Sequence, residues 1–170
     1  MSDASVTVGV RSTGADLRAI ADQLRAMDDA TVKRLFRRKL EDAAKPIVPR
    51  VRASVMAIPA TGEKHTGLRA RIAACVEVAS RDSAPRQVSV ALQVNPHKMP
   101  DREKGLPLYM EGVAFGRHDR WRHPVYGHSE RPWVQQRSHP YFYGPASAFG
   151  PAAGRAMQAA LEDITRQLGG

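Results

Sequence analysis

The sequence predicts an α+β fold, in which a small, mainly antiparallel sheet packs against a long N-terminal helix and a C-terminal helix. Apolar residues recur every three or four positions from Val32 to Val55, and again from Met157 to Leu168, which is helical spacing. Between these segments, two runs rich in β-branched residues alternate between apolar and polar positions, which is typical of half-buried strands.

The composition indicates one domain that spans residues 1–170 and has a core of its own. Cys75 is the only cysteine, so no internal disulfide can form, which fits a reducing cytoplasm. No apolar run is long enough to cross a bilayer, and the N-terminus lacks the layout of a signal peptide. We therefore expect no membrane partner.

The N-terminal third of the chain predicts one strand and two helices. Ser5–Val10 alternates and is rich in valine and threonine, which favours a short strand. Thr13 can cap a first helix that ends near Asp28, and a second helix begins at Asp29. Pro46 and Pro49 each delete a helical hydrogen bond, so we expect a kink or break there.

The middle of the chain predicts a hairpin flanked by loops. We expect a short helical turn over Leu68–Ala74, followed by strands over Cys75–Ala79 and Gln87–Val94. The polar run Arg81–Pro85 is typical of a turn between these strands. Asn95–Gly105 is charged and contains proline, so it is expected to be a long flexible loop.

The last third predicts further short elements and then the terminal helix. Leu106–Glu111 can form a helical turn, and Val113–Phe115 and Trp121–Tyr126 resemble short strands. Pro145 or Pro151 can occupy the first turn of the C-terminal helix, where its missing N–H costs nothing.

An aromatic, proline-rich segment, here called the aromatic arm, spans Trp121–Ala146. It contains both tryptophans and three of the four tyrosines of the chain. Prolines follow His123, Arg131 and His139, and each one forces extended or turn backbone on the residue before it. The arm is therefore expected to be an edge strand or loop, and neither a helix nor a central strand.

The formal net charge of +9 indicates that a polyanion is a natural partner. The strongest candidates for contact with DNA are basic residues that can share one side of the second helix: Arg34, Arg37, Arg38 and Lys45. The alternative for each of them is an ordinary exposed basic residue on a solvated helix face.

No constellation predicts an enzyme or a cofactor site. His118, His123 and His128 recur every five residues, but zinc sites use tighter pairs together with cysteine or acidic ligands, so no metal is expected. Acidic residues are scattered near these histidines without a motif of defined spacing. Two alternatives stay open: a basic DNA-binding module and a metal-dependent nuclease.

Two stretches resemble the head–tail joining proteins of long-tailed bacteriophages, also called neck, tail-completion or minor tail proteins. The first is the aromatic arm, with WRHPVYG, then WVQQ, then HPYFYGPA before an alanine-rich terminal helix. The second is residues 43–72, which resemble that family's first long helix, its proline and its Thr-Gly-Leu turn. Here Ala60–His65 lengthens the link before that turn, and it is expected to be flexible.

The resemblance implies a structural virion protein of a siphovirus, made in the cytoplasm of the host bacterium. It implies a homo-oligomeric ring, expected to be a hexamer, that joins the portal and connector complex to the tail tube and surrounds the DNA channel. Its partners would be a head-closure or connector protein, a tail terminator or tail tube protein, and genomic DNA held without sequence preference.

The aromatic residues of the arm have three interpretations: stacking on bases, packing in the core, or anchoring a neighbouring subunit. Together with the resemblance to ring proteins, the extended backbone favours a mixture of core and anchor. The predicted subunit-interface residues are Trp121, Trp133, Tyr141, Phe142 and Tyr143.

Overall fold

The structure is a computed structural model that describes residues 6–9, 29–59, 67–84, 87–112, 120–124 and 133–168. Helices and two small antiparallel sheets make up the described chain, so the predicted α+β class is confirmed. The expected first helix after Thr13, the link Ala60–His65 and the expected strand Val113–Phe115 all lie outside the described residues.

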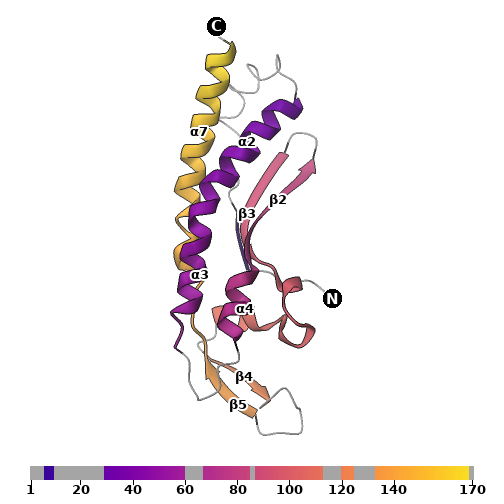
Figure 1. Cartoon of the computed structure of the whole chain (residues 1–170), viewed down its shortest axis with the longest axis vertical. Helices are drawn as coiled ribbons and strands as arrows, with labels where there is room; N and C mark the ends of the chain where they lie inside the picture. The colour runs from indigo at the N-terminus through magenta and orange to yellow at the C-terminus, as the bar shows by residue number, and fades with distance from the viewer. Residues whose placement is uncertain are drawn as a thin grey trace.

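A long, broken helix forms the spine of the molecule (Figure 1). It consists of α2 (Asp29–Ala44), a 3₁₀ turn η1 (Lys45–Ile47) and α3 (Val48–Met56). The break falls where Pro46 and Pro49 remove hydrogen bonds, as predicted. One stripe of the spine is buried throughout: Leu40, Ala44, Ile47, Val51 and Val55.

The larger sheet has three antiparallel strands in the order β1–β3–β2. They are β1 (Val6–Gly9), β2 (Val76–Ala84) and β3 (Gln87–Val94), and Val94 of the central strand lies opposite both Val6 and Val76. Alternate residues of β3 are buried, which places one face of the sheet against the helices.

The boundaries of β2 differ from the prediction at both ends. Cys75 is the last residue of helix α4 (Leu68–Cys75) and not the start of the strand. Arg81–Pro85 was expected to be a turn, yet β2 continues to Ala84 and pairs with β3, with a register shift between Asp82 and Ala84. The register shift makes the pairing of β2 with β3 irregular at this end, and irregular pairing tolerates the polar residues that predicted a turn.

The C-terminal helix α7 (Phe149–Leu168) runs along the spine on the side away from the sheet (Figure 1). Helix α2 contacts both α7 and β3. Lys39 of α2 and Asp163 of α7 form an ion pair at 2.8 Å. Pro151 lies in the first turn of α7, where a proline costs no helical hydrogen bond.

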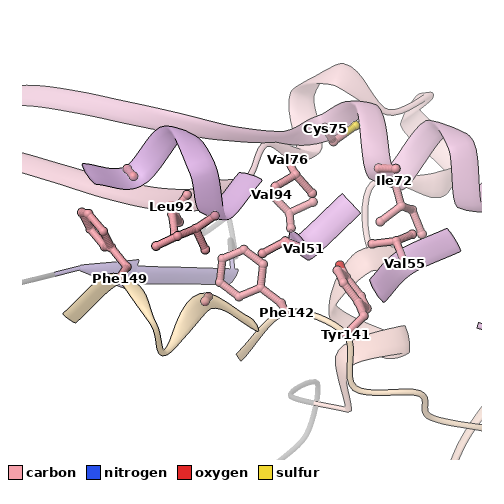
Figure 2. Packing of buried hydrophobic residues seen from close by; sticks show 14 of the residues in the cluster. Val51, Val55, Ile72, Cys75, Val76, Leu92, Val94, Tyr141, Phe142 and Phe149 are labelled. Carbon is pink, nitrogen blue, oxygen red and sulfur yellow. The ribbon is translucent and has the colours of Figure 1, made fainter. Parts of the chain in front are cut away.

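The hydrophobic core lies where these layers meet, and Figure 2 shows side chains from the helices, the sheet and the end of the aromatic arm converging on it. Its largest members, Tyr141, Phe142 and Phe149, come from the arm and from the start of α7. Buried aromatic side chains of this size contribute strongly to the stability of a core.

The segment 95–105, predicted as a long flexible loop, contains two 3₁₀ turns, η2 (Pro96–Lys98) and η3 (Asp101–Glu103). The guanidinium of Arg71 donates two hydrogen bonds of 2.9 Å to the carboxylate of Glu103, and Met99 is buried. The carboxylate of Glu77 on β2 accepts hydrogen bonds from Gln93 and Asn95 and pairs with Lys98. These contacts attach the segment to the sheet and to α4.

Glu77 makes the stability of this attachment depend on pH. Burial alone would raise the pKa of the Glu77 carboxyl, but the hydrogen bonds from Lys98, Gln93 and Asn95 outweigh burial and hold the pKa below its ordinary value of 4.5. Because the folded pKa is lowered, the contribution is present above the unfolded pKa and is lost as pH falls through the folded pKa.

We therefore expect Glu77→Gln to lower the free energy of unfolding at pH 6 and to have a progressively smaller effect below pH 4.5. Urea titrations of both proteins across this range measure the difference. Glu162→Gln, at an exposed position on α7, is the control. A difference between Glu77→Gln and the natural protein that is the same at every pH would contradict the assignment.

Candidate interaction surfaces

The aromatic arm divides into a projecting hairpin and a buried return to the core. The hairpin consists of β4 (Arg120–Pro124) and β5 (Trp133–Arg137), which pair with each other and with no other described strand. The return includes a turn of helix, α6 (Tyr143–Ala146). The end of the arm is thus helical, contrary to the expectation of an extended segment, because Pro145 lies in a first turn.

A buried carboxylate holds this return in place. Glu111 ends helix α5 (Leu106–Glu111) and is 5% exposed. One of its oxygens accepts hydrogen bonds of 2.7 Å from the backbone N–H groups of Tyr141 and Phe142. The other oxygen accepts one of 3.2 Å from the N–H of Tyr143. We call this arrangement the Glu111 clamp.

Further hydrogen bonds join α5 to the same segment. The N–H of His139 donates to the carbonyl of Met110 at 2.8 Å, and the hydroxyl of Ser138 donates to the carbonyl of Tyr109 at 3.2 Å. The hydroxyl of Tyr141 donates to the carbonyl of Pro107 at 3.2 Å. Burial, reinforced by the Glu111 carboxylate, raises the pKa of the Tyr141 phenol far above its usual value, so it remains a donor.

The clamp changes the interpretation of two predicted interface residues. Tyr141 and Phe142 are 1% and 0% exposed within their own chain, so they offer almost no surface to a neighbouring subunit. Within the subunit they belong to the core, which is one of the two roles expected for the arm, and their role as subunit contacts stays a prediction. The physical reason is that the three backbone donors of the clamp turn this stretch inward, and its two aromatic rings follow.

Trp133 and Tyr143 have the opposite environment. They are 52% and 43% exposed, respectively, and Val134 beside Trp133 is 38% exposed. The ring of Tyr143 makes an edge contact with Phe142, with ring centroids 5.8 Å apart. Large exposed aromatic side chains are enriched at protein interfaces, so the structure leaves these residues accessible to a partner.

Trp121 holds the hairpin against the body from one side. Its ring stacks on Tyr109 of α5, with centroids 5.0 Å apart and planes at 17°. Every residue of β5 is exposed. Figure 1 places the hairpin at the end of the molecule opposite the C-terminus, beyond the three-stranded sheet and the spine. The hairpin is therefore attached to the body through Trp121 of β4, whereas β5 is open to solvent on both faces.

The basic residues predicted on α2 do not form a uniform positive surface. Arg34, Arg38 and Lys45 are exposed, whereas Arg37 is half-buried. Lys45 pairs with Asp42 at 2.8 Å. Positions 34, 38, 41 and 45 share one side of a helix, so Glu41 lies within the same row. The charge of this helix face is mixed.

Neither a metal site nor a membrane-spanning helix occurs among the described residues. Nowhere among them do three histidine, cysteine or acidic side chains gather closely enough to hold a metal ion. None of the described helices is both long and apolar enough to cross a membrane. His118 and His128 of the predicted histidine series lie outside the described residues.

The sequence interpretation missed the role of Glu111, which it grouped with scattered acidic residues. A local signal does exist at the end of α5, where Gly112 has a φ of 80°. A left-handed glycine directly after a glutamate marks a helix end that turns sharply. It does not reveal that the glutamate accepts hydrogen bonds from residues about thirty positions later.

We expect Glu111→Gln to lower the free energy of unfolding by about 1–3 kcal/mol, because a buried amide replaces an acceptor-only carboxylate. Urea unfolding followed by circular dichroism measures the change. The matched control is Glu162→Gln, whose carboxylate is exposed and accepts one hydrogen bond from Gln158. Equal effects of the two substitutions would show that the clamp contributes nothing beyond a surface charge.

A scan against protein-family models and searches of curated proteins and of solved structures found no match to this chain. The assignment of a function therefore depends on the residues and on the geometry described above.

Proposed function

We propose that this chain is a structural virion protein that forms a ring at the head–tail interface of a long-tailed bacteriophage. The ring would join the portal and connector complex to the tail tube and surround the DNA channel. The proposal is supported by the resemblance of the aromatic arm and of residues 43–72 to neck proteins, together with the geometry of the hairpin.

The observation that carries the proposal is the exposed hairpin on a rigid base. A two-stranded hairpin is at best marginally stable in water unless something covers it. Here Trp121 packs on Tyr109 of the body, while Trp133 on one face of the hairpin and Val134 on the other stay exposed. An element of this kind is well suited to complete its packing against a neighbouring subunit, and the Glu111 clamp fixes the direction in which it projects.

A ring requires each subunit to offer one surface to a different surface of its neighbour. In the proposal, the hairpin with Trp133 supplies one of these surfaces, together with exposed Tyr143, which follows the hairpin in the chain. The expected symmetry is six-fold, with a head-closure or connector protein on one side of the ring and a tail terminator or tail tube protein on the other.

The positive charge suits a ring through which a genome passes. Arg34 and Arg38 on α2 and Lys45 on η1 would approach the channel in this proposal, and Arg37 is the least accessible member of that predicted set. Contacts of this type depend on phosphate charge and not on base sequence, so they allow DNA to slide.

A basic DNA-binding module is the second candidate, and the net charge of +9 favours it. It predicts salt-sensitive binding of DNA by the isolated monomer. A metal-dependent nuclease predicts cleavage that is lost when a histidine is changed. The nuclease alternative gives no reason for an exposed aromatic hairpin on a clamped base.

A reconstruction of the phage particle that encodes this chain tests the ring directly. We expect six copies around the channel between the connector and the tail tube, with the hairpin of each copy against its neighbour. An amber mutation in the gene should yield filled heads and tails that do not join. A location of the chain outside the neck would overturn the proposal.

Two substitutions separate the anchor from the core. Tyr141→Ala should lower the free energy of unfolding by about 3–5 kcal/mol, because it empties part of the core. Trp133→Ala should leave monomer stability within about 0.5 kcal/mol of the natural protein, because surface substitutions rarely cost more. It should nevertheless reduce the yield of joined particles.

The readouts are urea unfolding of the purified chain and complementation of the amber mutant. A Trp133→Ala chain that restores full infectivity would contradict the role of the hairpin in assembly. Trp133→Phe is the matched control, since it keeps an aromatic ring at the same position.

A further inference from the structure

We propose that the outward face of the β4–β5 hairpin binds the phosphate backbone of a nucleic acid. This surface, here called the ribbon face, is defined by the register of the two strands. Arg120 lies opposite Arg137, and Arg122 lies opposite Gln135. Alternation along each strand places these four residues on one side of the hairpin, with Trp133 two residues from Gln135 on that side.

The opposite side of the hairpin faces the body. Trp121 lies on that side by alternation, and it stacks on Tyr109 of α5. All the defining residues of the ribbon face with described side chains are exposed: Arg120, Arg122, Trp133, Gln135 and Arg137. The ribbon face is therefore directed away from the subunit's own packing.

The charges on this face have no counterpart within the described chain. Neither β4 nor β5 contains an acidic residue. Among the described residues, none of Arg120, Arg122 and Arg137 forms an ion pair. Arg120 and Arg137 are direct cross-strand neighbours, and like charges in that position destabilise a hairpin. An anion between them would turn this cost into an attraction.

The acidic side chains that the structure describes are engaged within the subunit. Each acidic side chain that the structure describes accepts a hydrogen bond or forms an ion pair inside the chain: Glu41, Asp42, Glu77, Asp101, Glu103, Glu111, Glu162 and Asp163. A second copy also carries the same net charge of +9. Charge complementarity therefore favours an external polyanion over another copy of this chain.

The geometry favours a nucleic acid among polyanions. Arg120 and Arg122 are two residues apart on one strand, which separates them by about 7 Å, comparable to the spacing of successive phosphates. Arginine forms bidentate hydrogen bonds with phosphate, and a two-stranded ribbon is narrow enough to enter a DNA groove. Trp133 at the end of the row adds an aromatic surface of the kind that contacts bases or sugars.

This proposal concerns a surface of the isolated subunit and does not depend on ring formation. It also differs from the channel role proposed for α2, where Glu41 and Asp42 interrupt the basic row. In a monomer the ribbon face would already bind a DNA duplex.

The test is fluorescence anisotropy of a short labelled DNA duplex of mixed sequence, titrated with the full chain at several salt concentrations. The variant is Arg120→Gln, Arg122→Gln and Arg137→Gln combined. The logarithm of the binding constant falls with the logarithm of the salt concentration by about 0.9 per phosphate contact. Loss of three contacts should therefore reduce the change in affinity between 50 and 200 mM salt by a factor of roughly 40. A second duplex of different sequence should bind equally well.

The matched control removes the same charge elsewhere: Arg50→Gln, Arg102→Gln and Arg155→Gln combined, at three exposed positions on α3, η3 and α7. This control variant should keep most of the natural chain's affinity for the duplex and most of the dependence of that affinity on salt. Urea midpoints confirm that both triple variants fold.

Three results would overturn the proposal. The first is no binding of the duplex by the natural chain, and the second is equal loss in the ribbon and control variants. The third is competition by poly-glutamate as effective as competition by unlabelled DNA, which would identify an acidic protein as the partner. Loss of particle assembly with intact DNA binding in a Trp133→Ala chain would concern the ring proposal alone.

Discussion

The buried carboxylate of Glu111 is the interaction on which the rest of the aromatic arm depends. Three backbone N–H groups converge on it, which satisfies both the carboxylate and a stretch of chain that would otherwise bury unpaired donors. The stretch held by Glu111 places Tyr141 and Phe142 in the core, where they pack beside residues of the spine and the sheet (Figure 2). The return of the hairpin thus becomes part of the domain's own core.

The same constraint explains why the hairpin is exposed. A segment anchored at its end by the clamp and at β4 by the Trp121–Tyr109 stack cannot fold back over the body. Its remaining residues are left in solvent, including a half-exposed tryptophan that a self-contained domain would bury. Anchored strands with exposed side chains are well suited to contact with a partner, because little conformational entropy is lost when they bind.

Features that depend on local periodicity were predictable from the sequence. The apolar stripe of the spine, its break at Pro46 and Pro49, and the alternation of β3 all follow from residues close together in the chain. The Glu111 clamp was not predictable, because it joins residues about thirty positions apart. Among the aromatic side chains, spacing could not separate buried Phe142 from exposed Trp133, since only tertiary packing distinguishes them.

The distribution of charge distinguishes the hairpin from helix α2. Carboxylates in the described chain serve to hold elements together: Asp163 joins α7 to α2, Glu103 joins η3 to α4, and Glu77 joins β2 to η2. The chain has 26 basic residues against 17 acidic ones, so the arginines and lysines outnumber the carboxylates with which they can pair. The surplus must lie on surfaces, where like charges repel and favour any polyanion that approaches. On the ribbon face that surplus is concentrated on two short strands without an acidic residue, whereas on α2 it is diluted by Glu41 and Asp42. The local concentration of positive charge, more than the total charge, decides where a phosphate backbone binds. The ribbon face is therefore a better binding surface for a phosphate backbone than α2.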